Sequence, residues 1–338
     1  MVQHHDDGVS AERAHVLDHM PARWPTLLRV LATSVRRAPE GLESLPPSLW
    51  QLDQVRVDRA RVERYALLCG LPVDPESIPL IFPQLMGFPL LLRYFGSPDC
   101  PWPAMGIVHL GNEIDSLAPI AVGDALRLTL STGSLIRHPK GQAFTVLLRA
   151  ERGSQAVWSV RQTLLRLGVR TPSGPDWDES AIVGGPAQAQ AVQSPFERAG
   201  EFDAPRGIGR RYAPVSGDFN PIHLSTLAAR LLGFQQTIAH GLWSLARALA
   251  VLGEGPRGWP PDAPVRLSTV FGSPLRLPSR VGVWRSKAGD GVQSFELRDA
   301  RGERIHLRAR LTPDLPREPV SPTALPDTGP TGRKGVTG

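Results

Sequence analysis

Residues 212–223 read Tyr-Ala-Pro-Val-Ser-Gly-Asp-Phe-Asn-Pro-Ile-His, and this stretch decides how the rest of the chain is interpreted. Gly217 and Pro221 are turn formers that mark a loop, and the proline biases the residue before it toward an extended backbone. After the proline, aliphatic residues recur at helical intervals. The pattern therefore predicts a loop followed by a buried helix over about 222–233, with a glycine at its C-terminal end.

An acid and a base stand on either side of this turn. Asp218 lies in the loop and His223 in the first turn of the predicted helix, so both can face one small volume where the helix amides favour an anion. A general base must come within about 3 Å of its proton, and a loop-to-helix junction can achieve this for two side chains. Alone, the aspartate would more often be a turn residue and the histidine a helix cap or a core residue.

A second signal follows at residues 239–242, Ala-His-Gly-Leu, directly before another apolar helical stretch. The amide of Gly241 at such a helix start can meet a carbonyl oxygen on which negative charge develops. The alternative is that this glycine only permits tight packing of the helix on a sheet. Two proton-transfer groups and one amide donor are the equipment for adding water to an activated acyl chain, or for removing it.

The octapeptide 216–223 resembles the motif of the MaoC-like hydratase/dehydratase family, approximately Ser-Gly-Asp-x-Asn-Pro-aliphatic-His, and matches it without a departure. The family includes (R)-specific enoyl-CoA hydratases. The resemblance implies a hot-dog fold and reversible hydration of trans-2-enoyl thioesters to (R)-3-hydroxyacyl thioesters. It also implies that Asp218 and His223 are catalytic and that Gly241 lies in the oxyanion hole. Three further residues of the stretch are expected to position substrate or water: Asn220, Ser216 and Tyr212.

The upstream chain resembles a degenerate copy of the same unit. Tyr65–Gly70 parallels Tyr212–Gly217 at an offset of 147 residues. The first copy lacks the chemistry, because Leu71, Val73 and Glu76 stand in place of the acid, the asparagine and the base. A repeat of this size indicates two like domains packed together. With the resemblance, it predicts an α+β double hot-dog, in which two antiparallel sheets each wrap a central helix.

Elements and boundaries follow from this layout. An apolar segment at 79–95 corresponds to a central helix that Pro83 and Pro89 would interrupt, and 24–35 could form a short amphipathic helix. Alternating patterns predict strands at 107–114, 125–131, 143–150, 156–165, 265–271, 281–285, 293–299 and 304–311. The expected divisions are an N-terminal extension (1–55), a degenerate hot-dog (56–170), a linker (171–200), a catalytic hot-dog (201–312) and a disordered tail (313–338).

Composition agrees with a cytoplasmic protein of two domains. The chain has 338 residues, 41% of them hydrophobic, and no apolar run approaches the roughly 20 residues needed to span a bilayer. Residues 1–25 lack a signal-peptide pattern. Cys69 and Cys100 are the only cysteines and give no disulfide framework.

The net charge of +6 raises the question of an anionic partner. No nucleic-acid-binding motif accompanies it and aromatic residues make up only 6%, so we expect no nucleic-acid partner. The arginines of 298–310 form either a solvated sheet face or a surface that attracts CoA phosphates or an acidic acyl carrier protein. Zinc spacing and a dinucleotide fingerprint are both missing, so we expect no metal and no redox cofactor.

Several alternatives stay open at this level. The substrate carrier is CoA or an acyl carrier protein, and the latter would make the protein a dehydratase of fatty-acid or polyketide synthesis. A non-catalytic acyl-CoA-binding hot-dog protein is a different class, against which the intact acid and base argue. The first half either shapes an acyl pocket or only completes a dimer-like interface. A homodimer of double hot-dog chains, the acyl chain length and the direction of reaction are also undecided.

Overall fold

The computed structural model describes residues 13–35, 39–169, 173–183, 196–253, 263–286 and 292–313. We call the part up to residue 169 the N-terminal half and the part from residue 196 the C-terminal half. The N-terminal half contains, in chain order, β1 (Arg13–Leu17), α1 (Arg23–Ala32), η1 (Thr33–Val35), β2 (Ser48–Arg56), α2 (Arg59–Cys69), α3 (Phe82–Phe95), β3 (Ile107–Ser116), β4 (Ala125–His138), β5 (Gly141–Arg152) and β6 (Gln155–Leu167). After α4 (Ser180–Val183), the C-terminal half contains β7 (Glu197–Ala204), α6 (Ile208–Ser216), α7 (Pro221–Leu224), α8 (Thr226–Leu231), α9 (Gly241–Leu252), β8 (Val265–Phe271), β9 (Ser279–Arg285), β10 (Gln293–Asp299) and β11 (Ile305–Pro313).

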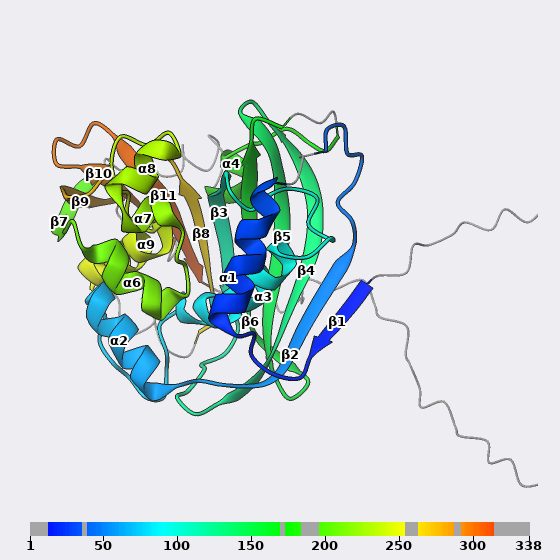
Figure 1. Cartoon of the computed structure of the whole chain (residues 1–338). Helices are drawn as coiled ribbons and strands as arrows, with labels where there is room; N and C mark the ends of the chain where they lie inside the picture. The colour runs from blue at the N-terminus through cyan, green and yellow to red at the C-terminus, as the bar shows by residue number, and fades with distance from the viewer. Residues whose placement is uncertain are drawn as a thin grey trace, which may run out of the picture.

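All described strands belong to one sheet, whose order is β1-β2-β4-β5-β6-β3-β8-β11-β10-β9-β7 (Figure 1). Apart from β1, each half repeats one order of strands: β2-β4-β5-β6-β3 in the first, and β7-β9-β10-β11-β8 in the second. The halves meet where β3 pairs antiparallel with β8, with Gly111 opposite Val270 and Ser116 opposite Val265. The internal repeat inferred from the sequence is therefore visible in the strand order.

The two separate sheets that we expected are joined edge to edge into one. The physical reason is that β3 and β8 would otherwise each expose a row of unpaired backbone amides and carbonyls, and pairing them removes both edges. Arg266 of β8 also makes two hydrogen bonds of 2.6 and 2.8 Å to Asp115 of β3, directly opposite it in register. The α+β class stands, with a single sheet in place of two.

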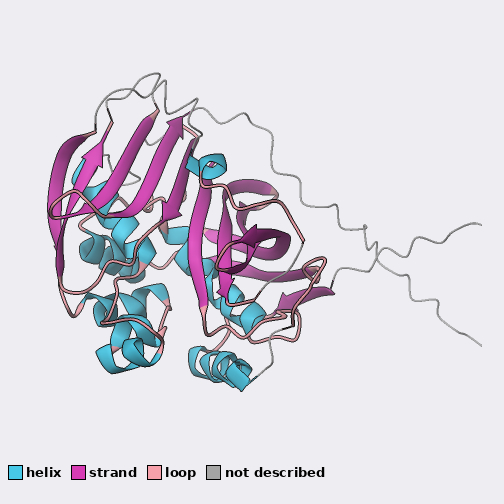
Figure 2. Cartoon of the chain, turned by 90° about the horizontal axis from the view of Figure 1, so that it is seen from above, coloured by secondary structure: helices cyan, strands magenta, loops and turns pink. Residues whose placement is uncertain are grey.

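Each half wraps its sheet around one long apolar helix, α3 in the first and α9 in the second. Figure 2 shows most of the helices on one side of the curved sheet. The expected interruption of the first helix by prolines is wrong, because α3 runs unbroken from Phe82 to Phe95. Pro83 lies in the first turn, where a missing N–H breaks no intrahelical bond. Pro89 is accommodated inside a helix that is buried along most of its length.

The buried helix predicted over 222–233 is also wrong. Two short helices, α7 and α8, replace it, because Ser225 takes an extended conformation and caps α8 by accepting a hydrogen bond from the amide of Ala228. Leu227 and Leu231 are then 70% and 80% exposed. The central helix of the C-terminal half is instead α9, which begins at Gly241.

The predicted strands all occur, with ends at most seven residues from the expected ones and an exact match for 265–271 and 293–299. Three further strands were not predicted from the sequence patterns. β1 and all of β2 except Arg56 lie within the region 1–55 that we assigned to an extension, and β2 pairs with β4 as a member of the sheet. β7 begins inside the region 171–200 that we assigned to a linker, and it pairs with β9. Of the tail expected over 313–338, Pro313 is the last residue of β11, and the rest lies outside the described residues.

Helices of the two halves also hydrogen-bond to each other. Trp243 and Arg247 of α9 donate hydrogen bonds of 3.0 and 2.9 Å to the carbonyls of Leu68 and Cys69, at the end of α2. In the other direction, the guanidinium of Arg61 on α2 donates to the carbonyl of Val215 on α6, at 2.9 Å. The loop that follows α6 is therefore held where the two halves meet.

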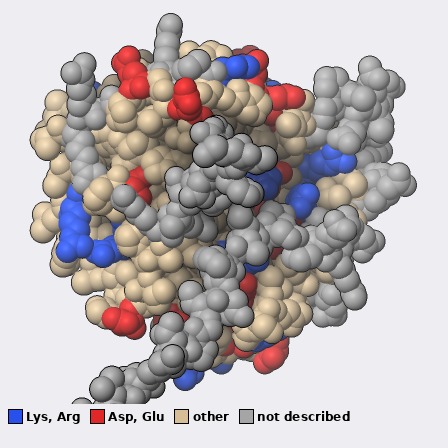
Figure 3. All heavy atoms as spheres, turned by 90° about the vertical axis from the view of Figure 1, so that its right-hand side faces the viewer, with Lys and Arg blue, Asp and Glu red and all other residues tan. Residues whose placement is uncertain are grey.

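The surface shows no segregation of charge on the face turned toward the viewer in Figure 3, where basic and acidic side chains are interspersed among the atoms not drawn in grey. No helix of the described residues is long and apolar enough to cross a bilayer.

Candidate active site

The loop that carries Asp218 begins where α6 ends. Gly217 follows the helix with φ of 84°, a left-handed conformation that glycine adopts without steric cost. A Cβ at this position would lie 3.3 Å from the ring of Phe88 on α3, the central helix of the other half. The hydroxyl of Ser216 accepts a hydrogen bond of 3.1 Å from the Asp218 amide and thereby fixes the start of the loop.

Asp218 and His223 are brought together as the sequence predicts. Their side chains approach to 3.8 Å between Asp218 Oδ2 and His223 Nε2. Asp218 Oδ1 accepts a hydrogen bond of 3.0 Å from the Asn220 amide. The Asn220 side chain in turn accepts from the Ile222 amide and caps α7. In this structure the asparagine organises the loop that separates the acid from the base.

The other ring nitrogen of His223 fixes its tautomer. Nδ1 lies 2.9 Å from the carbonyl oxygen of Ile238. Because a carbonyl can only accept, Nδ1 must carry a proton, and in the neutral ring Nε2 then presents a lone pair. That lone pair is on the nitrogen nearest Asp218. The geometry matches a base whose orientation is set by the backbone.

His240 is a member of this cluster that we did not predict. Its ring stacks on that of His223 with centroids 3.8 Å apart, and its Nε2 lies 3.1 Å from the carbonyl oxygen of Asp218. Burial and, to a smaller extent, the neighbouring His223 together lower the pKa of His240 to about 3, so the ring is neutral near pH 7. The sequence signal for His240 was its position directly before Gly241. We had assigned a role in this His-Gly pair to the glycine alone.

Tyr212 lies behind the stacked histidines. Its ring centroid is 5.0 Å from that of His240, and its hydroxyl is buried with no hydrogen-bond partner among the described residues. Burial raises the pKa of this phenol well above its ordinary value, so it stays protonated. The observed contact is with His240, and a role in positioning substrate or water stays a prediction.

Gly241 is the first residue of α9, so its amide has no acceptor within the helix. A Cβ at this position would lie 2.9 Å from Phe271 Cε1, closer than real Cβ contacts allow. The structure therefore supports the packing interpretation of this glycine directly. An oxyanion role for its amide stays a prediction.

The N-terminal half reaches this region through His109 on β3. The His109 ring centroid is 4.9 Å from that of Phe271, the side chain that packs against Gly241. His109 Nε2 lies 2.7 Å from the side-chain oxygen of Asn112, which a buried hydrogen bond from Asn112 to Gln84 orients. Burial lowers the pKa of His109 to about 4. Nothing in the sequence motif indicated this contact, which depends on the pairing of β3 with β8.

Asp218, His223 and His240 also offer one ligand atom each within 4.8 Å of one another, an arrangement that could hold a metal ion. Using His240 Nε2 as a ligand would break its hydrogen bond to the Asp218 carbonyl. The hydrogen bonds as they stand favour an acid–base site.

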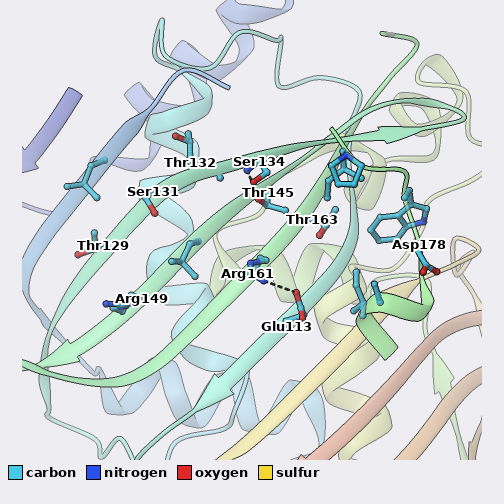
Figure 4. A pocket seen from close by; sticks show the side chains of 18 of the residues that line it. Glu113, Thr129, Ser131, Thr132, Ser134, Thr145, Arg149, Arg161, Thr163 and Asp178 are labelled. Atoms are coloured by element: carbon cyan, nitrogen blue, oxygen red, sulfur yellow. Dashed lines mark hydrogen bonds and ion pairs between the residues drawn. The ribbon is translucent and has the colours of Figure 1, made fainter. Parts of the chain in front are cut away.

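A hollow of about 800 Å³ lies on the other face of the sheet, away from α3, and none of the motif residues line it. Figure 4 shows Thr129, Ser131 and Thr163 pointing into it, with Arg161 facing Glu113 at 3.6 Å. Arginines and carboxylates both line the hollow. Because its charges offset one another, we assign it no ligand.

Comparisons with known proteins agree with the motif. Residues 204–299 match a family model described as MaoC like domain. The chain is 31% identical over 291 residues to 3-hydroxyacyl-thioester dehydratase X of Mycobacterium tuberculosis, covering 86% of this chain and 98% of that protein.

Solved structures give the same picture. The crystal structure of HtdX of Mycobacterium tuberculosis at 2.4 Å has a TM-score of 0.63 and 28% identity, over 78% of this chain and 98% of that chain. A MaoC-like dehydratase from Phytophthora capsici has a TM-score of 0.63 at 18% identity, over 82% of this chain and 98% of that chain, which supports the fold alone. With its motif intact and a relative matched along nearly its whole length, this chain belongs to the MaoC-like hydratase/dehydratase family.

Proposed function

We propose that the protein is a hydro-lyase that reversibly hydrates trans-2-enoyl thioesters to (R)-3-hydroxyacyl thioesters, with Asp218 and His223 as its acid–base pair. The observation that carries the proposal is the 3.8 Å separation of Asp218 Oδ2 from His223 Nε2. This separation is too long for a direct hydrogen bond and suits one water shared by both groups. The relative from Mycobacterium tuberculosis is named as a 3-hydroxyacyl-thioester dehydratase, which supports the same chemistry.

In the hydration direction, His223 Nε2 accepts a proton from the shared water while the water oxygen bonds to C3. Nδ1 stays bonded to the Ile238 carbonyl throughout, so the positive charge that develops on the ring is stabilised there and by Asp218. The pair then returns a proton to C2 on the same face. Dehydration is the same sequence reversed, and the direction depends on the concentrations of the two thioesters.

Negative charge develops on the thioester oxygen as C3 is attacked. The amide of Gly241, at the start of α9, is the donor that we assign to this oxygen, because the helix offers it no internal acceptor. A thioester placed there would lie next to Phe271, which packs on Gly241. The carrier is CoA or an acyl carrier protein.

The test is incubation of the full chain with crotonyl-CoA, following loss of the enoyl absorbance and release of free thiol separately. We expect loss of absorbance without thiol release. Asp218→Asn and His223→Ala should each lower turnover by at least about 10²-fold, the usual contribution of an acid–base residue. Asp203→Asn, at an exposed carboxylate on β7, is the matched control and should keep wild-type turnover.

Two results would contradict the proposal. Thiol release in step with absorbance loss would indicate a thioesterase. Near-wild-type turnover in both Asp218→Asn and His223→Ala would show that the pair is not the acid and base.

A further inference from the structure

Helix α1 exposes most of its large apolar side chains to solvent, unlike an ordinary surface helix. The side chains that it buries are Thr26 and Val30, followed by Thr33 where η1 begins. Its bulkiest apolar side chains point away from the protein: Trp24 is 67% and Leu28 66% exposed. A surface helix normally places its apolar face on the core and its polar face in water, so this arrangement requires an explanation.

The exposed side chains form one continuous stripe. At about 100° per residue, Trp24, Leu28 and Leu31 fall within an arc of roughly 60° on one side of α1, and Met20 before the helix and Val35 in η1 are exposed as well. We call this set the α1 stripe: Met20, Trp24, Leu28, Leu31 and Val35. The buried residues of α1, Thr26 and Val30, lie on the opposite side of the helix. One face of α1 therefore packs on the protein, and the other faces solvent.

A second exposed apolar surface lies on the same side of the molecule. Helix α8 exposes Leu227 and Leu231, and Leu232, which caps its C-terminal end, is exposed as well. Figures 1 and 2 together show α1 and α8 projecting from the same side of the sheet. Phe219 connects α1 to the site: it follows Asp218 in the loop, and its ring centroid is 6.1 Å from that of Trp24.

The charged side chains in the segments around α1 and α8 are all basic. Residues 19–39 and 219–253 contain no aspartate or glutamate. Arg23 and Arg29 flank the α1 stripe, and Arg230 lies between the exposed leucines of α8. The guanidinium of Arg23 lies 5.2 Å from the centre of the Phe219 ring. The partner of this surface must therefore offer apolar contact and negative charge together.

We propose that α1 and α8 dock the protein on the surface of an anionic lipid bilayer. A helix with Trp and Leu on one face and arginines at its margins is typical of segments that lie in the headgroup region. Trp24 and the leucines would enter the boundary of the acyl chains, while Arg23, Arg29 and Arg230 would approach the lipid phosphates. This contact is peripheral and requires no spanning helix.

Other occupants fit these observations less well. A two-fold contact between copies through α1 would set its arginines against the same arginines, with no carboxylate in 19–39 to separate them. An acidic carrier protein could pair with the arginines, but a stripe as large as this one also needs an extended apolar complement. A bilayer supplies both in one surface.

The proposed docking brings the loop that carries Asp218 close to the lipid, because Phe219 contacts both Arg23 and Trp24. A thioester with a long acyl tail partitions into the bilayer, and the docked protein would then bind it at the bilayer surface. The inference does not depend on the reaction that the site catalyses, since binding to lipid is measured without turnover.

The experiment is co-sedimentation of the full chain with vesicles of phosphatidylcholine alone and of phosphatidylcholine mixed with phosphatidylglycerol. We expect binding to the anionic vesicles that added salt weakens. The double variant Trp24→Ser/Leu28→Ser should weaken that binding at least about tenfold, because it removes two large apolar side chains. Leu67→Ser is the matched control and should bind as wild type. Leu67 is 79% exposed but lies on α2, and so belongs neither to the α1 stripe nor to α8.

Three outcomes would overturn the proposal. The first is no binding of the wild type to anionic vesicles. The second is an equal loss of binding in Leu67→Ser. The third comes from sedimentation equilibrium without lipid: a dimer that Trp24→Ser/Leu28→Ser dissociates would assign the stripe to a second copy of the chain. Circular dichroism of the double variant checks that it is folded.

Discussion

At the scale of single residues, the site depends on two histidines held in different ways. His223 is oriented by the Ile238 carbonyl and turns its lone pair toward Asp218. His240 is buried and donates to the backbone of the same aspartate. Both Nε2 atoms lie near Asp218 Oδ2, at 3.8 Å for His223 and 3.9 Å for His240, but only His240 also hydrogen-bonds to the Asp218 backbone. The loop that carries Asp218 begins beyond the left-handed Gly217, where the hydrogen bonds of α6 no longer hold the backbone, so these contacts fix its position.

The buried state of His240 predicts a pH dependence of stability. Its pKa is about 3 in the folded protein, against an ordinary value of 6.5 when the chain unfolds. Between these values the unfolded chain binds a proton that the folded one refuses, so stability falls as pH drops from about 6.5 toward 3. The slope for one such group is at most about 1.4 kcal/mol per pH unit.

His240→Asn should remove this contribution, so its free energy of unfolding should fall less steeply with decreasing pH than that of the wild type. Denaturant titrations at pH 7, 6 and 5 measure the slope. His19→Asn, at an exposed histidine, is the control and should follow the wild type. Identical slopes for all three proteins would show that His240 is not held neutral by burial.

At the scale of elements, much of the fold could be predicted from the sequence. The strands of the sheet that alternate clearly were found, and the motif predicted that Asp218 and His223 lie together and that a helix begins at Gly241. Strands β1 and β2 were missed because the motif began further along the chain. The helix over 222–233 was wrong because periodicity cannot show that Ser225 starts a new helix, or that its leucines face outward. His240 and His109 required the tertiary structure.

The helix ends make a separate prediction. Gly217 and Gly253 both end a helix with positive φ, 84° and 72°. An alanine in that conformation costs about 1–2 kcal/mol at either position. At Gly217 the new Cβ also approaches Phe88 at 3.3 Å, whereas nothing lies within 4 Å of one at Gly253.

Gly217→Ala and Gly253→Ala should therefore lose similar stability, but only Gly217→Ala should lose turnover, by roughly tenfold or more, because it displaces Asp218. Thermal melts and the crotonyl-CoA assay measure the two effects. An equal fall in turnover for both variants would mean that the loss follows from stability and not from the position of the loop.

At the scale of the whole molecule, the site belongs to both halves. The loop with Asp218 packs on Phe88 of α3, and His109 of β3 contacts Phe271 beside Gly241. We propose that the N-terminal half, although it lacks an acid and a base, completes the single site of each chain. Its degenerate sequence is consistent with this, because shaping a site requires packing and not proton transfer.

This arrangement predicts how the C-terminal half behaves alone. A fragment of residues 196–313 would expose the edge of β8, lose the pairing of Asp115 with Arg266, and uncover Trp243 where α2 now covers it. Unpaired strand edges and apolar faces of this kind associate. We expect the fragment to aggregate or to dimerise through β8, with a changed preference for acyl chain length if it retains activity. Size-exclusion chromatography and assays with enoyl-CoA substrates of several lengths measure both, with the full chain as the reference. A monomeric fragment with unchanged kinetics would refute the contribution of the first half, because every contact across the β3–β8 seam would then be dispensable.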